Sequence, residues 1–114
     1  MDKLEGSDLF HLDDLLTDEQ RMVRQSVRAF VDKEVMPVIG KHYRDGTFPT
    51  DLIKPMGALG MLGDNLHGYG CSGMDAISYG LVMQEVERAD SGIRSFVSVQ
   101  GALCMYPIHE FGSE

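Results

Sequence analysis

Apolar residues recur at steps of three and four along most of this chain, which places them on one face of an α-helix. The first stripe contains Val23, Val27, Phe30, Val31, Val35 and Val38. The later stripes contain Leu52, Ile53, Met56 and Leu59, then Ile77, Leu81, Val82 and Val86, and finally Ile93, Phe96, Val97, Val99, Leu103 and Met105. No strand pattern of comparable strength occurs. The spacing predicts an all-α bundle of four helices joined by short connections.

Capping residues and helix breakers mark the predicted helix boundaries. Thr17 and Gln20 have the spacing of a capping box, so the first helix should begin there. It should end near Pro37, because a proline ring breaks a regular helix. The second helix should be short because glycines follow it, and Ser72 is predicted to cap the third. The fourth should end within residues 107–111.

The second connection, between the second and third predicted helices, is rich in glycine. Residues 60–73 have the sequence GMLGDNLHGYGCSG, which predicts a shaped loop with positive φ angles. As a nucleotide-binding signal these glycines are weak, because no Lys-Ser/Thr follows them. Cys71 and Cys104 lack the spacing of a disulfide framework or zinc site, and we assign neither a catalytic role. Cys104 lies in the fourth stripe and is predicted to be a small buried residue.

Composition and charge exclude several classes of protein. The chain has 114 residues, 43% of them hydrophobic and 25% charged, as expected for one soluble globular domain. No apolar run approaches the roughly 20 residues of a membrane span. The net charge of -8 and the scattered basic residues argue against a nucleic-acid partner. The four histidines are isolated, so we expect no metal site.

The two ends of the sequence differ in character from its middle. Residues 1–14 carry five acidic side chains and one lysine, and we interpret them as an N-terminal extension rather than a targeting peptide. A cytoplasmic location with reduced thiols is the corresponding expectation. Residues 15–114 form the predicted helical domain. Ser113 followed by Glu114 resembles the cap of a further helix, so we expect the sequence to be a fragment.

The polar turn between the third and fourth helices is the candidate binding site. Arg94 and Ser95 should lie in the first helical turn, where free backbone N–H groups and the helix dipole favour an anion. Ser98 lies four residues after Arg94 on the same face, so both side chains could bind one carboxylate. The alternative is structural: Arg94 pairs with Glu87 or Asp90, and the serines only cap the helix.

Several motifs follow one another in a fixed order. The first set is Leu16-Thr17-Asp18-Glu19-Gln20, then Met56 to Gly63, then Gly68 to Gly73. These motifs resemble the N-terminal helical domain of acyl-CoA dehydrogenases. A second set is Tyr79-Gly80-Leu81, Glu87 to Ser95, Ser98-Val99-Gln100 and Met105 to Ile108. This set is similar to glutaryl-CoA dehydrogenases in particular, and the resemblance covers residues 15–114.

The resemblance implies an FAD-dependent oxidoreductase built from this domain, a middle β-domain and a C-terminal helical bundle, assembled as a homotetramer. In glutaryl-CoA dehydrogenases, the arginine and serine matching Arg94 and Ser95 hold the distal carboxylate of the substrate. The residues matching Glu87 and Ser98 lie nearby. FAD would lie mainly against the other domains, and the catalytic glutamate belongs to the C-terminal one. This sequence alone should therefore be inactive, with no catalytic residue of its own.

The implied reaction is oxidation of glutaryl-CoA followed by decarboxylation to crotonyl-CoA. The electrons would pass to an electron-transfer flavoprotein. Two alternatives remain open at the level of sequence. The chain could belong to an acyl-CoA dehydrogenase for another acyl-CoA, or it could be a stand-alone, non-catalytic helical interaction module.

Overall fold

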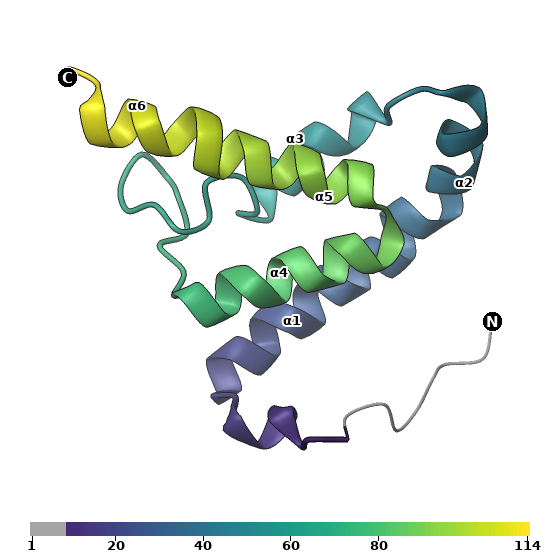
Figure 1. The fold of residues 1–114 in the computed structure, drawn as a ribbon, viewed down its shortest axis with the longest axis horizontal. Helices are drawn as coiled ribbons and strands as arrows, with labels where there is room; N and C mark the ends of the chain where they lie inside the picture. The colour runs from purple at the N-terminus through teal and green to yellow at the C-terminus, as the bar shows by residue number, and fades with distance from the viewer. Residues whose placement is uncertain (1–8) are drawn as a thin grey trace.

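The computed structural model describes residues 9–114, and all of its regular elements are helical (Figure 1). The α-helices are α1 (Asp18–Phe30), α2 (Met36–Asp45), α3 (Ile53–Ala58), α4 (Ala76–Ala89), α5 (Ser91–Ser98) and α6 (Tyr106–Phe111). Short 3-10 helices, η1 (Leu12–Leu15) and η3 (Thr50–Leu52), and π-helical segments, η2 (Val31–Val35) and η4 (Val99–Met105), complete the set. The predicted all-α class is confirmed. Residues 1–8 of the predicted N-terminal extension lie outside the described residues.

Two prolines lie just after π-helical turns instead of ending a helix. The helix that begins with α1 passes through η2 and Pro37 and ends at Asp45, so the prediction of an end near Pro37 was wrong. Pro107 follows η4 in the same way. Proline lacks an N–H group and its ring collides with the carbonyl four residues earlier in an α-helix. The residue before each proline instead bonds the carbonyl five residues earlier, a wider turn that accommodates the ring.

Helices α1 and α4 pack side by side and run in the same direction (Figure 1). At their starts, Gln20 Nε2 donates to Asp75 Oδ2 at 3.1 Å. Further along, Arg28 Nη2 lies 2.6 Å from Oε1 of the buried Glu85. These polar contacts fix the register of the two helices, while the apolar faces between them form the core.

The caps agree with prediction at one helix and differ at another. The Thr17–Gln20 capping box is present, with bonds of 3.2 and 2.9 Å, and α1 begins directly after it. The cap of α4 is Asp75 rather than Ser72, because Gly73 has a positive φ and delays the helix to Ala76. Ser72 Oγ instead donates to the Gly60 carbonyl at 2.9 Å. Ser72 therefore closes the loop rather than starting the helix.

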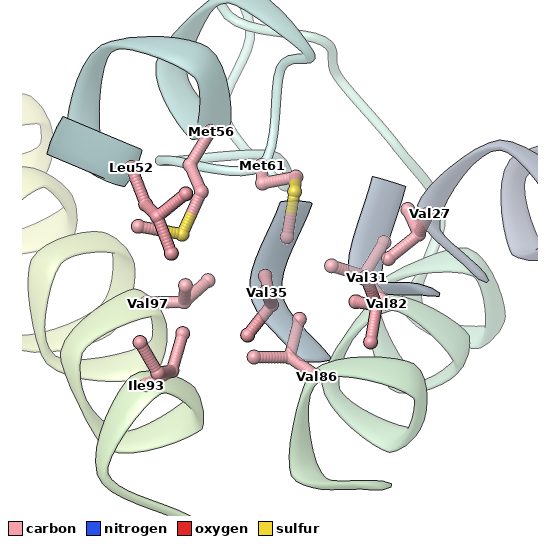
Figure 2. Packing of buried hydrophobic residues seen from close by; sticks show 10 residues of the cluster. All are labelled: Val27, Val31, Val35, Leu52, Met56, Met61, Val82, Val86, Ile93 and Val97. Atoms are coloured by element: carbon pink, nitrogen blue, oxygen red, sulfur yellow. The ribbon is translucent and has the colours of Figure 1, made fainter. Parts of the chain in front are cut away.

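One apolar core joins the helices (Figure 2). Its fully packed members are Val27, Val31, Val35, Leu52, Met56, Met61, Val82, Val86, Ile93 and Val97. Predicted stripe members that are exposed are Val38, Leu59, Ile77, Val99 and Leu103, and Cys104 is exposed as well, contrary to prediction. The last three lie in η4, where each residue of the wider turn advances less around the axis and the stripe leaves the core.

Residues 60–73 form the shaped loop that the glycines predicted. Five glycines and Tyr69 have positive φ angles within it. Gly63 packs against η4 so closely that a Cβ on Gly101 would lie 3.5 Å from the Gly63 nitrogen. The loop is therefore held on the helix that carries the candidate site. No helix among residues 9–114 is long and apolar enough to cross a membrane.

Candidate functional site

Asp90 forms the sharp turn between α4 and α5. Its backbone is extended, with φ -167° and ψ 130°, and its Oδ1 accepts a hydrogen bond from the Ile93 N–H at 2.8 Å. Its carbonyl accepts the Arg94 N–H at 3.1 Å. The backbone N–H of Arg94 is thus already bonded, and a carboxylate caps the helix. The prediction of a free backbone N–H group at Arg94 was wrong, so the guanidinium is the group of Arg94 that can bind an anion.

Four side chains meet across this turn, and we call them the Arg94 cluster: Glu87, Ser91, Arg94 and Ser98. Arg94 Nε donates to Glu87 Oε2 at 2.6 Å, and Arg94 Nη1 donates to Ser98 Oγ at 3.3 Å. Ser91 Oγ donates to Glu87 Oε1 at 2.5 Å. The cluster therefore links the last turn of α4 to the first two turns of α5.

The guanidinium of Arg94 has binding capacity left. Nε and Nη1 have partners, while Nη2 has none among residues 9–114. The Arg94 side chain is 37% exposed, so a ligand can reach it from solvent. Hydrogen bonds from Ser91 and then from Arg94 hold the pKa of Glu87 below its usual value of 4.5. Glu87 is thus ionised at neutral pH, and it orients the arginine without filling its outer edge.

The structure brings together three of the four predicted site residues. Glu87, Arg94 and Ser98 are in contact, whereas Ser95 is exposed and contributes its carbonyl, which accepts from Ser98 Oγ at 3.1 Å. The alternative interpretation, in which Arg94 pairs with an acidic residue of the turn, also described part of the site, because Arg94 does pair with Glu87. Ser91 was missed, and its position four residues after Glu87 was the available signal.

A buried carboxyl group lies in the neighbouring loop. Asp64 is 1% exposed, and its Oδ2 has no hydrogen-bond partner among residues 9–114. Burial raises the pKa of Asp64 to about 6. Burial also raises the pKa of Tyr79, the charge of Asp64 adds to the rise, and the charge of Arg94 opposes it. The Tyr79 phenol therefore lies within electrostatic reach of both groups.

The described residues offer little to a metal ion or a dinucleotide. Within residues 9–114, no group of three His, Cys, Asp or Glu side chains is placed to hold a metal. The glycine-rich loop contains no lysine or arginine, and its buried polar group is the carboxyl of Asp64. A pyrophosphate would be repelled rather than held there. Arg94 thus remains the group best suited to an anionic ligand, and a carboxylate fits its edge.

Comparisons with known proteins agree with this architecture. The family model described as "Acyl-CoA dehydrogenase, N-terminal domain" matches residues 17–114. A crystal structure of a glutaryl-CoA dehydrogenase from Mycobacterium smegmatis in complex with FADH2 superposes with a TM-score of 0.90 at 48% identity. The match covers 93% of this chain and 28% of that one. A second structure of glutaryl-CoA dehydrogenase from the same organism gives a TM-score of 0.88 at 49% identity, covering 90% of this chain and 27% of that one.

Curated relatives are similar over the same stretch. The mitochondrial short-chain specific acyl-CoA dehydrogenase of Mus musculus is 34% identical over 102 residues, which are 86% of this chain and 24% of that protein. An acyl-CoA dehydrogenase of Bacillus subtilis is 36% identical over 100 residues, covering 87% of this chain and 26% of that protein. The chain thus spans about a quarter of the length of the relatives it matches.

Proposed function

This chain belongs to the acyl-CoA dehydrogenase family, and we propose that it is the substrate-recognition part of an FAD-dependent enzyme that converts glutaryl-CoA to crotonyl-CoA. Its own role would be to bind and orient the distal carboxylate of the acyl group. FAD, when bound to the intact enzyme, supplies the hydride acceptor for the oxidation. The groups that hold FAD and the catalytic glutamate would lie in the parts of the enzyme outside this chain.

The observation that carries this proposal is the open edge of Arg94. Glu87 and Ser98 fix the guanidinium from two sides, and Nη2 stays available to a carboxylate. A substrate carboxylate would form charge-assisted hydrogen bonds there, which are about twice as strong as neutral ones. The same site would discriminate against fatty acyl chains, because an apolar end would cover the guanidinium and leave it unpaired.

The exposed apolar surface of α6 and η4 supports a role within a larger assembly. Leu103, Ile108 and Phe111 are 69%, 72% and 82% exposed. Large apolar side chains grouped in this way usually pack against another part of a protein. This surface disfavours the stand-alone interaction module. We propose that the rest of the enzyme covers it, that the enzyme is a homotetramer, and that an electron-transfer flavoprotein accepts the electrons.

Replacing Arg94 with alanine in the intact enzyme tests the proposal. The loss of a hydrogen-bonded charge should raise KM for glutaryl-CoA and lower kcat/KM on the order of 10- to 100-fold. Turnover of butyryl-CoA, which has no distal carboxylate, should not fall. Arg21→Ala is a matched control, because Arg21 lies in α1 and pairs with Asp18 at 3.0 Å. Unchanged kinetics with glutaryl-CoA in the Arg94 variant would refute the proposal.

The second candidate is an acyl-CoA dehydrogenase that acts on another acyl-CoA. The short-chain specific relatives, at 32–35% identity, favour keeping this candidate. Initial rates with glutaryl-CoA and with unbranched acyl-CoAs of four to eight carbons separate the two, together with release of CO2. If butyryl-CoA is preferred and no CO2 is released, the second candidate replaces the first.

A further inference from the structure

We infer that Ser91 is a positioning residue that keeps the outer edge of Arg94 open for the ligand, acting through Glu87. This inference rests on the proposed function. Within the Arg94 cluster, Ser91 makes no hydrogen bond with Arg94; its hydroxyl donates to Glu87 Oε1 at 2.5 Å. Any effect of Ser91 on ligand binding must therefore pass through the Glu87 carboxylate.

The local backbone frees the Ser91 hydroxyl for this task. Ser91 is the first residue of α5, a position where serine often serves the helix terminus. Here the preceding Asp90 already caps the helix through the Ile93 N–H. Because Asp90 is extended, the chain turns sharply, and the first turn of α5 faces the last turn of α4. The Ser91 hydroxyl can then reach back across the turn to Glu87.

The two carboxylate oxygens of Glu87 accept hydrogen bonds from different residues. Oε1 accepts from Ser91, and Oε2 accepts from Arg94 Nε at 2.6 Å. A carboxylate held in this way meets the Nε side of the guanidinium and leaves Nη2 for a ligand. Without the Ser91 bond, Oε1 could pivot onto Nη2, which lies on the same side of the guanidinium as Nε, and complete the two-pronged pair that arginine and carboxylate groups favour. Glu87 would then compete with the carboxylate of the substrate.

The test is Ser91→Ala in the intact enzyme, assayed with glutaryl-CoA and butyryl-CoA. KM for glutaryl-CoA should rise roughly 3- to 10-fold, the effect of about one hydrogen bond, with butyryl-CoA kinetics unchanged. Ser91→Thr keeps the hydroxyl and should restore KM, since Ser91 borders an open groove of about 420 Å³ that can take a methyl group. Ser26→Ala, an exposed serine of α1, is the matched control.

A double-mutant cycle separates positioning from a general structural effect. If Ser91 acts through Glu87, Ser91→Ala should change KM little when Glu87→Gln is already present. Equal losses with both substrates, or additive effects in the double variant, would overturn the inference. Arg94→Ala in the same assay tests the proposed function itself. A raised KM in the Arg94 variant with no change in Ser91→Ala would refute only the role of Ser91.

Discussion

Replacing Asp64 with asparagine should change the way the stability of the fold depends on pH, so that the variant gains relative to the wild type as the pH rises. Burial raises the pKa of Asp64 from the usual 3.8 to about 6, so the folded state keeps the proton to a higher pH than the unfolded state. The stability that the protonated Asp64 contributes to the fold is therefore fully present below pH 3.8 and is lost as the pH rises through 6. The difference between these two pKa values corresponds to about 3 kcal/mol of folding free energy.

Asparagine is neutral throughout, so this loss should disappear in the variant. The new amide can itself lack a partner, at a cost of about 1–3 kcal/mol that does not depend on pH. The decisive quantity is therefore the difference in unfolding free energy between variant and wild type, compared at pH 4 and pH 7.5. We expect this difference to move in favour of the variant by about 1–3 kcal/mol as the pH rises.

Urea unfolding followed by circular dichroism at 222 nm measures this difference, with both proteins compared at each pH so that other carboxyl groups cancel. Asp51→Asn changes an exposed carboxylate in η3 and is the matched control. If the Asp64 variant and wild type keep the same stability difference at both pH values, the Asp64 carboxyl is not held in an unfavourable buried site, and the reasoning fails.

Two further predictions concern the scaffold, and the same unfolding assay measures both. Glu85→Ala removes a carboxylate that is 2% exposed and binds two arginines. It should lower the free energy of unfolding by about 2–3 kcal/mol. This is less than the roughly 3–5 kcal/mol typical of a broken buried pair, because both arginines reach solvent. Gly63→Ala should cost slightly more than Gly68→Ala: both have positive φ, but only at Gly63 must the end of the Met105 side chain, 2.4 Å from the new Cβ, move aside. A loss below 1 kcal/mol in the first, or equal losses in the second pair, would contradict these accounts.

Local chemistry was enough to predict much of the fold. The Thr17 capping box uses bonds between residues three apart, and such bonds follow from sequence spacing alone. The stripes predicted Val27, Val31 and Val35 as core residues because they repeat with the helical period. The all-α class and the shaped loop at residues 60–73 follow from the same kind of short-range information.

The π turns could not be predicted in this way. Pro37 has the local features of a helix end, but the wider turn of η2, which packs against α4, accommodates the proline ring and lets the helix continue. The same change of pitch in η4 exposes Leu103 and Cys104. Periodicity assumes one pitch along the whole helix, so a π turn that alters the pitch changes which residues face the core.

The candidate site was likewise predictable only in part. The sequence by itself determined that a guanidinium, a carboxylate and several hydroxyls would gather at the turn after α4, because they lie within a few helical turns of one another. Only the tertiary structure decided which groups pair: Asp90 takes the helix terminus, Ser91 takes one oxygen of Glu87, and Arg94 keeps a free edge. Hydrogen-bond partners depend on the angle at which two helices meet, and that angle is set by the core between residues far apart in the sequence.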